Sequence, residues 1–436
     1  MNGVPGMIGS GMPETLELKR LISYIVSAVS KYQQSVFIPE ELGELIDDIE
    51  RAQQKLEESG YKDVNILELN VPKELFHYWD SVSSAREMYR EKIRLNFIGA
   101  TRELSPNQIS VLFNCWLREI NQGINRAKVI GSHHGSGFTS NVNPTYFSFE
   151  ANSWKLNGKQ SFDGSPLVNV TSMRVNVLPI FLEGPTRMIR TVSNNQTRLI
   201  YNDLKKSELR DDTLKMYTIS GRLEGQSMDM GRLMAFSPGW LENQSVWLHM
   251  SFKYYLELLR SKLYIEFYEE MLSGGMPPFM NATIYGRSLI ECSSFLASSA
   301  FQDPSVQGQG FVARLSGATA EFLNMWILIF IGPKPFVLDE NTNDLSMQLI
   351  PALPLWLFEK YPGSQQVPQV RFRLFGSIHV TYHNTIREDL FDIPPRQYLI
   401  TYKDGSTLSL NSSTIPGDIA RKIRGQQLID GIDAFF

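Results

Sequence analysis

The chain has 436 residues, of which 42% are hydrophobic and 11% aromatic, enough for a large core and more than one domain. Its net charge of -4 and pI near 6.0 give no global basic field, which argues against a nucleic-acid partner. Two cysteines, Cys115 and Cys292, form no disulfide framework, so we expect a reducing, cytoplasmic location. The longest apolar run, 325–336, is cut by Gly332-Pro333, so we expect no membrane partner.

The first part of the chain, 1–130, has the pattern of a helical segment. Apolar residues recur there at helical spacing, and Pro or Gly residues mark several of the ends. The predicted helices are 14–31, 39–58, 79–93 and 106–127. A loop rich in Gly, Ser and Asn at 133–143 follows and suggests a boundary, so we place a second segment at 131–200.

Within that second segment, 146–177 alternates and carries turn residues, which favours strands or an irregular insertion. Helices are expected at 180–190 and 204–216. The third segment, 201–362, carries buried helices at 246–272, 288–300 and 317–331. The last segment, 363–436, alternates at 369–382, 397–402 and 406–410, which predicts a small β domain. The sequence therefore predicts a mainly α protein that ends in a β module.

One motif combines a carboxylate and an imidazole. Glu242 and His249 lie two helical turns apart, just after a Pro238-Gly239 turn, so both side chains are expected near one face of a helix start. A carboxylate can hold sugar hydroxyls there, and an imidazole can contact an anion. The other interpretation is a capping glutamate and a core histidine, and the spacing alone leaves both open.

A second motif follows Gly308-Gln309-Gly310 and offers a guanidinium, two hydroxyls and a bare glycine backbone at a helix start. Its residues are Arg314, Ser316, Gly317 and Thr319. Free amides at such a start favour an anion such as phosphate, although by itself the motif is more simply explained as an ordinary helix N-cap by Ser316. Arg287 is a further candidate anion ligand, or else a salt-bridged arginine.

Other common chemistries lack their motifs. His133-His134 has no cysteine or acidic partner at ligand spacing, so we expect a solvated loop and no metal. The chain also lacks a P-loop, a dinucleotide fingerprint and a serine-hydrolase elbow. These absences argue against nucleotide hydrolysis, dehydrogenase chemistry and serine hydrolysis.

Taken in order, the motifs resemble those of the cellobiose-phosphorylase-like glycoside phosphorylases. Pro238-Gly239, Glu242-Asn243 and His249 resemble that family's "Pro-Gly, Glu-Asn, His" segment, and 314–320 resembles its "Thr-Gly-Thr-Ala" phosphate loop. Fainter matches follow in the same order at Gly332-Pro333, Pro351–Trp356, Phe372–Gly376 and His383-Asn384. The likeness therefore covers about 238–384.

The resemblance implies a partial (α/α)6 toroid followed by a small C-terminal β domain. It also implies inverting, phosphate-dependent cleavage of a β-glucosidic bond in a β-glucan or disaccharide, with inorganic phosphate as co-substrate and no cofactor. By position, phosphate would be bound by His249, Arg314, Ser316, Gly317 and Thr319, and sugar by Glu242, Asn243 and Arg287. The chain departs from the family where Gln244-Ser245 replaces Gly-Gly and where Ala318 replaces the second threonine of the loop.

A larger departure concerns the general acid, which in the family is an aspartate in a "Trp-Asn-Asp-Gly-Met-Asn" run. The chain begins just after the place where this aspartate is expected, so the catalytic residue is unknown. We expect a fragment that is inactive or very weak alone, with a missing N-terminal portion or a homodimer partner. Asp80 and Glu14 are candidate substitute acids. The alternatives are a non-catalytic carbohydrate-binding or assembly protein on the same toroid, and an inverting hydrolase.

Overall fold

The computed structural model describes residues 9–61, 68–135, 137–312, 316–358 and 367–436. The chain divides into two compact units. The N-terminal unit comprises Met1–Tyr254 and Ser273–Ala313, and the C-terminal unit comprises Tyr255–Leu272 and Arg314–Phe436. With 42% helix and 23% strand, the protein is mixed rather than mainly α. The described residues contain several small sheets and no barrel, so the predicted toroid is not confirmed.

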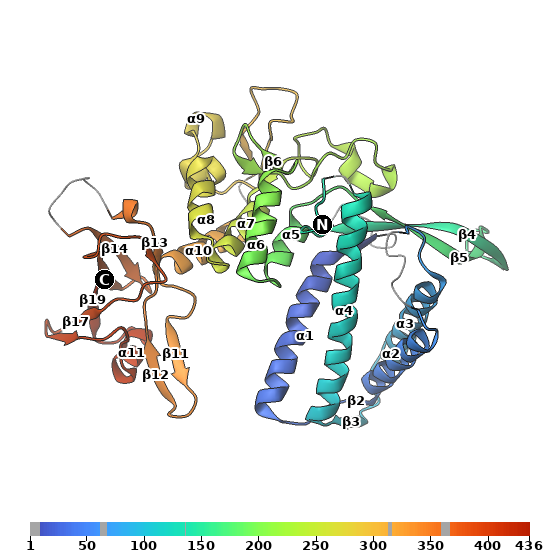
Figure 1. Ribbon diagram of the computed structural model, residues 1–436, viewed down its shortest axis with the longest axis horizontal. Helices are drawn as coiled ribbons and strands as arrows, with labels where there is room; N and C mark the ends of the chain where they lie inside the picture. Colours follow the sequence, from blue (N-terminus) through green and yellow to red (C-terminus); the bar gives the residue numbers. More distant parts are fainter. Residues whose placement is uncertain (1–8, 62–67, 136, 313–315, 359–366) are drawn as a thin grey trace. The chain divides into compact units, whose positions relative to one another are not determined.

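Four long helices open the N-terminal unit, as the apolar spacing predicts: α1 (Met12–Tyr32), α2 (Glu40–Glu58), α3 (Lys73–Lys92) and α4 (Pro106–His134). Figure 1 shows α1 beside α4, and α2 beside α3. The α1–α4 pair buries Leu16 and Ile22 of α1 and Leu112 of α4. The short strands β2 (Val36–Pro39) and β3 (Thr101–Leu104) pair antiparallel and join the ends of the two helix pairs. None of the described helices combines the length and the apolar character needed to cross a bilayer.

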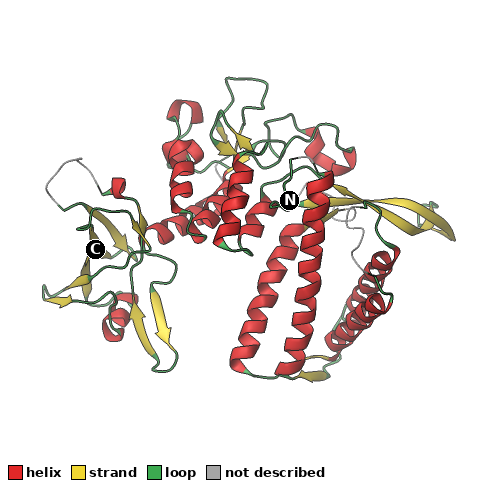
Figure 2. Cartoon of the chain, viewed as in Figure 1, coloured by secondary structure: helices red, strands yellow, loops and turns green. Residues whose placement is uncertain are grey.

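A long antiparallel hairpin follows, which confirms the strands expected at 146–177. It is formed by β4 (Tyr146–Gln160) and β5 (Pro166–Val177), and β1 (Gly9–Gly11) pairs with the first residues of β4. Figure 2 shows this hairpin extending from the helices as a two-stranded arm. The loop expected from 133 begins later, because α4 continues to His134.

The rest of the N-terminal unit is built from short elements. They are α5 (Glu183–Ile189), α6 (Asn194–Lys205), β6 (Arg210–Asp211), β7 (Met216–Tyr217), η1 (Met228–Ala235), β8 (Val246–Trp247), α7 (Leu248–Arg260), η3 (Pro277–Phe279), α9 (Ala282–Tyr285), β9 (Phe295–Leu296) and β10 (Gly310–Phe311). Strands β8, β9 and β10 form one small antiparallel sheet. The division between the two units falls within α7.

The helix predicted at 204–216 is wrong. The hydroxyl of Ser207 donates to the Leu204 carbonyl at 2.9 Å as α6 ends. Asp211 Oδ1 then accepts the backbone N–H groups of Thr213 and Leu214, each at 3.0 Å, and Lys215 is left-handed with φ 58°. An aspartate that bonds the backbone two and three residues ahead stabilises a tight turn, so β6 and β7 form a hairpin here.

The helix predicted at 288–300 is also wrong. Ser293 is fully buried, and its backbone N–H donates to the Tyr285 hydroxyl at 3.0 Å. That hydroxyl also donates to the Glu291 carbonyl at 2.6 Å. Strand β9 then pairs on both sides, with β8 and β10. Tertiary hydrogen bonds to an extended backbone therefore override the apolar spacing in this serine-rich segment.

The stretch predicted as one helix at 246–272 is divided. It forms β8, α7, α8 (Tyr264–Glu270) and the short π-type turn η2 (Met271–Gly275). Lys262 lies between α7 and α8 with a left-handed φ of 60°. A lysine in that conformation cannot continue a helix, so the apolar pattern persists while the helix breaks.

The C-terminal unit carries the β module that the sequence predicts. Its strands are β11 (Phe336–Asp339), β12 (Asp344–Met347), β13 (Ala352–Leu353), β14 (Gln369–Leu374), β15 (Ile378–His383), β16 (Leu390–Phe391), β17 (Gln397–Tyr402), β18 (Thr407–Leu410) and β19 (Ile429–Phe435). Its helices are α8, α10 (Ser316–Phe330), η4 (Leu355–Leu357) and α11 (Gly417–Arg424). The main sheet has the order β14-β15-β19-β17-β18. The Tyr382 hydroxyl of β15, fully buried, donates to the Phe330 carbonyl at the end of α10 at 2.5 Å.

Candidate functional site

The segment 237–245, which we call the Glu242 loop, is a compact turn with an unusual backbone. Gly239, Leu241 and Gln244 all have left-handed φ values, at 82°, 48° and 54°. A Cβ atom on Gly239 would lie 2.3 Å from the backbone nitrogen of Phe301, so only glycine fits there. The glycine of the Pro-Gly pair is therefore required by close backbone contact as well as by the turn.

An aromatic cluster holds the Glu242 loop in place. The Trp240 ring lies 4.7 to 5.2 Å, centroid to centroid, from the rings of Phe295, Phe301 and Phe311. Phe295 and Phe311 are directly paired residues of β9 and β10. Because such edge and tilted contacts add to apolar burial, the small sheet fixes the position of the loop.

Within the loop, Glu242 and Asn243 have different partners. The Glu242 carboxylate forms an ion pair with Arg232, while its side chain keeps 12% exposure and that of Arg232 55%. Asn243 is buried, and its side chain donates to the Phe236 carbonyl at 2.8 Å. Asn243 therefore stabilises the loop itself, whereas Glu242 and Arg232 present an acceptor and a donor at the surface.

Trp247 connects the Glu242 loop to His249. Its indole N–H donates to the Leu241 carbonyl at 2.7 Å, and its ring meets the His249 ring edge to face, with centroids 5.5 Å apart. His249 occupies the first turn of α7. Trp247 thus links the loop backbone at Leu241 to the His249 ring. Glu242 itself lies in the loop before β8 and not on α7, so the prediction that both side chains share one face of a helix start is wrong.

The His249 imidazole is held neutral. Burial and, to a smaller extent, the positive charge of Lys253 lower its pKa, the charge of Glu183 opposes them, and the net pKa is about 4. Its Nδ1 atom is buried and has no hydrogen-bond partner among the described residues. A buried ring nitrogen without a partner is costly, and a polar ligand would supply one.

A polar cluster beside His249 was not predicted from the sequence. Glu183 opens α5, and its carboxylate accepts a hydrogen bond from the Tyr146 hydroxyl at 3.2 Å. Arg187 lies 3.6 Å from the same carboxylate and also donates to Glu17 at 3.0 Å. Burial raises the pKa of Tyr146, and the charges of Glu183 and then Glu14 raise it further, so the phenol remains a donor. We call Glu14, Glu17, Tyr146, Glu183 and Arg187 the Glu183 cluster.

The approach of β4 to α5 builds this cluster. The Thr145 hydroxyl donates to the Phe181 carbonyl at 2.8 Å and accepts the Gly184 N–H at 2.9 Å. These two bonds fix the first turn of α5 against the start of β4. The partners are almost forty residues apart in the chain, so no local spacing could have indicated Glu183.

The two candidate substitute acids lie in different surroundings. Glu14 belongs to the Glu183 cluster because its charge acts on Tyr146. Asp80 is exposed in the second turn of α3, which begins at Lys73 and not near Trp79 as predicted.

Arg287 is engaged in holding the backbone. Its Nε donates to the Gly310 carbonyl at 2.6 Å, and its guanidinium pairs with Glu291 at 2.8 Å. A Cβ atom on Gly310 would lie 2.3 Å from the Ser293 hydroxyl oxygen, so this glycine serves close packing of β10. These contacts match the salt-bridge interpretation of Arg287, and a sugar contact by it stays a prediction.

The second motif lies in the C-terminal unit. Arg314 falls outside the described residues, and nothing is described of the Ser316 side chain, although Ser316 is the first residue of α10. Gly317 is half-buried and Thr319 exposed in the first turn of that helix. The N-terminal unit holds the predicted phosphate ligand His249 and the predicted sugar ligands Glu242, Asn243 and Arg287. The predicted phosphate ligands therefore come from both units.

The histidine pair is in a different setting from the one expected. His133 and His134 form the last turn of α4 rather than a loop, and both are exposed. Across the described residues, no group of three or more His, Cys, Asp or Glu side chains could hold a metal ion.

Comparison with known proteins does not assign the chain to a family. Neither the models of known protein families nor the curated proteins include a match to the sequence.

Proposed function

We propose that this chain is a carbohydrate-active protein that resembles an inverting glycoside phosphorylase, with His249 directed to phosphate and Glu242 to sugar. The supporting observation is the neutral imidazole of His249, whose buried Nδ1 has no partner among the described residues. The Glu242–Arg232 pair lies in the loop that Trp247 links to His249. The toroid that the resemblance implies is part of this proposal.

The proposal gives these groups roles in binding and assigns none of them a proton transfer. In inverting phosphorolysis phosphate itself attacks the anomeric carbon, so the protein needs one general acid and no base. A neutral imidazole can donate one N–H to a phosphate oxygen without adding a fixed charge. The nearby cations Lys253 and Arg187 offset the charge of Glu183, which would otherwise repel the anion.

We assign no general acid, so we expect binding without fast turnover. The test is calorimetric titration of the full chain with inorganic phosphate, with cellobiose, and with both together. His249→Ala should weaken phosphate binding and Glu242→Gln should weaken cellobiose binding, each about tenfold for the loss of one charge-assisted or buried hydrogen bond. His379→Ala, at an exposed strand position, is the matched control.

The products distinguish the alternatives. Saturable binding without product would favour a non-catalytic carbohydrate-binding protein. Sugar 1-phosphate would identify a phosphorylase and would mean that the chain holds its own acid, whereas free glucose would indicate a hydrolase. Binding of neither phosphate nor sugar would rule out the proposal.

A further inference from the structure

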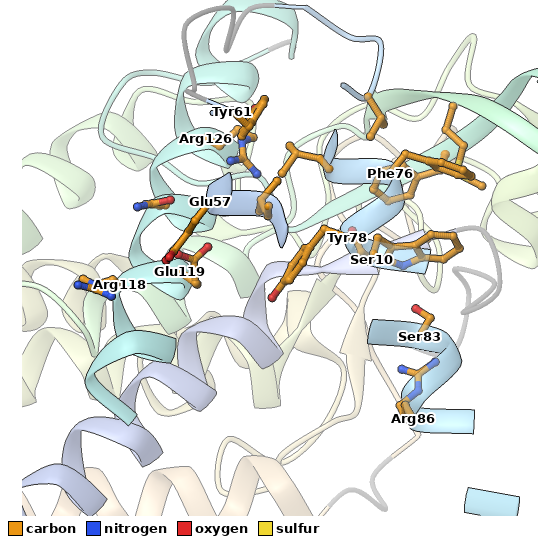
Figure 3. Close-up of a pocket in the computed structure, with 18 residues that line it drawn as sticks. Ser10, Glu57, Tyr61, Phe76, Tyr78, Ser83, Arg86, Arg118, Glu119 and Arg126 are labelled. Atoms are coloured by element: carbon orange, nitrogen blue, oxygen red, sulfur yellow. The ribbon is translucent and has the colours of Figure 1, made fainter. Parts of the chain in front are cut away.

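A large cavity of about 1080 Å³ lies within the N-terminal unit (Figure 3), and no residue of either sequence motif lines it. Its walls come from α2, α3, α4 and the hairpin β4–β5, with Ser10 of β1 at one side. Ligand pockets in proteins reach roughly 1,000 Å³, so the cavity is large enough for an extended ligand.

One part of the cavity is polar and carries charges of both signs. The pKa of Arg118 is raised, first by a hydrogen bond to Cys115 Sγ and also by the charges of Glu57 and Glu119, which places both carboxylates near this guanidinium. Burial raises the pKa of Tyr78, and the charge of Glu119 raises it further, so its hydroxyl remains a donor. Figure 3 shows these side chains projecting from three different helices.

Another part is aromatic. Phe76 and Trp79, both of α3, line this part, with ring centroids 5.9 Å apart and planes tilted by 36°. Trp79 is 53% exposed although it lines the cavity, so a large apolar face remains open to solvent or to a ligand. An indole face of this kind accepts the apolar face of a sugar ring, and the surrounding polar groups satisfy its hydroxyls.

The mixture of groups limits the class of ligand. Glu57 and Glu119 would repel an anion, and Arg86, Arg118 and Arg126 would repel a cation. A neutral molecule with many hydroxyls and flat apolar faces is repelled by neither set of charges. We propose that this cavity binds a neutral oligosaccharide, which stacks on Trp79 and Phe76 and hydrogen-bonds to Glu57, Arg118 and Glu119.

The cavity is connected to the Glu183 cluster through β1. Ser10 lines the cavity and pairs with Phe147, while the next residue, Gly11, pairs with Tyr146. Tyr146 in turn donates to Glu183. The inference goes beyond the proposed function because it requires neither phosphate nor the Glu242 loop.

The test is titration calorimetry of the full chain, in phosphate-free buffer, with a length series of soluble cello-oligosaccharides. Removal of a stacking aromatic typically weakens binding about tenfold or more, so Trp79→Ala should raise the Kd by at least that factor. Trp79→Phe should restore most of the affinity, because a ring remains. The matched control is Trp154→Ala on β4, where the tryptophan is 58% exposed and does not line the cavity.

Two further variants make the result decisive. Glu57→Gln, which preserves size, should weaken binding, and Glu150→Gln, at an exposed position of β4 outside the cavity, should leave the affinity unchanged. The proposal is overturned if Trp79→Ala and Trp154→Ala have equal affinities, if Glu57→Gln and Glu150→Gln have equal affinities, or if the wild-type chain shows no saturable binding. Because phosphate is absent, the outcome is independent of the phosphate titration that tests His249.

Discussion

His249 gives the chain a measurable acid sensitivity at the level of one residue. Its pKa is about 4 in the folded protein and 6.5 for the unperturbed side chain. Between these pH values the unfolded chain binds a proton that the folded chain does not, so the free energy of unfolding falls as the pH drops from 6.5 to 4. The full effect is about 3 kcal/mol at most.

The measurement is chemical denaturation of wild type and His249→Gln at a series of pH values. Wild type should lose up to about 3 kcal/mol more than the variant on going from pH 7 to pH 4, and the two should run parallel above pH 7. His379→Gln, at an exposed position, should follow wild type throughout. Parallel curves for wild type and His249→Gln at all pH values would show that the imidazole is not held neutral.

Gly239 offers a second test at the same scale. Gly239→Ala places a methyl group 2.3 Å from the Phe301 backbone nitrogen, in a residue with φ 82°. Gly158→Ala meets a similar φ of 78° but has nothing within 4 Å of the new methyl. The left-handed conformation costs each variant roughly 1–2 kcal/mol. The clash should cost Gly239→Ala roughly 1–3 kcal/mol more.

Thermal and denaturant unfolding of the two glycine variants would measure the difference. Gly239→Ala should also lose sugar affinity, because the displaced loop carries Glu242. Equal destabilisation by the two substitutions would mean that the loop moves away from Phe301 at no cost.

Part of the site could be predicted from the sequence. Whether a residue could be found depended on how far along the chain it lies from its partners. Glu242 and His249 share one local segment, so their spacing could indicate a shared neighbourhood. Glu183 and Tyr146 could not be found in this way, because Thr145 joins β4 to α5 across almost forty residues. The cavity was missed for the same reason, since α2, α3, α4 and the hairpin meet only in the folded chain.

Elements were predicted well where local signals act alone. The four long helices of 12–134 show clear apolar periodicity, and β17 (Gln397–Tyr402) has the predicted bounds. The failures have two kinds of cause. At 204–216 and 246–272 the helix is ended locally, by the Asp211 turn and by the left-handed Lys262. At 288–300 the Tyr285 hydroxyl and the pairing of β9 hold the backbone extended, although the same apolar spacing is also compatible with a helix.

The start of α4 illustrates a local signal that can be tested. The Ser105 hydroxyl accepts the Gln108 N–H at 3.3 Å, and the Gln108 side chain accepts the Ser105 N–H at 2.9 Å, a complete capping box. Ser105→Ala should lower the free energy of unfolding by about 1 kcal/mol. Ser110→Ala, inside the same helix, should change it by only about a few tenths of a kcal/mol, because alanine has the higher helix propensity.

Urea denaturation of both serine variants provides the comparison. Equal effects of the two substitutions would show that the capping box contributes nothing, and that packing of α4 on α1 alone stabilises the helix start.

For the whole molecule, the apolar surface of α1 predicts self-association. Leu18, Leu21 and Tyr24 recur every three residues along α1 and are 45%, 55% and 71% exposed. Contiguous exposed apolar side chains favour contact with another chain. We therefore expect concentration-dependent association in sedimentation velocity. The double variant Leu21→Glu/Tyr24→Glu should reduce it.

The matched control is Ser23→Glu/Ser27→Glu, which adds the same charge to the same helix at polar positions. If charge alone prevents association, both double variants will behave alike. A monodisperse wild-type monomer at all concentrations would contradict the prediction that this surface drives association.

The two units are not continuous in sequence, which limits how the protein can be divided. Tyr255–Leu272 of the C-terminal unit interrupts the N-terminal unit, which resumes at Ser273 and ends at Ala313. In the C-terminal unit the Tyr264 hydroxyl donates to Asp392 at 2.8 Å, and the Tyr268 hydroxyl donates to the Ala352 carbonyl at 2.5 Å. A single cut before residue 314 would release a β module without the helix that covers Phe391. The two units are thus interleaved in the gene, so neither could have been gained or lost whole in evolution by one simple truncation.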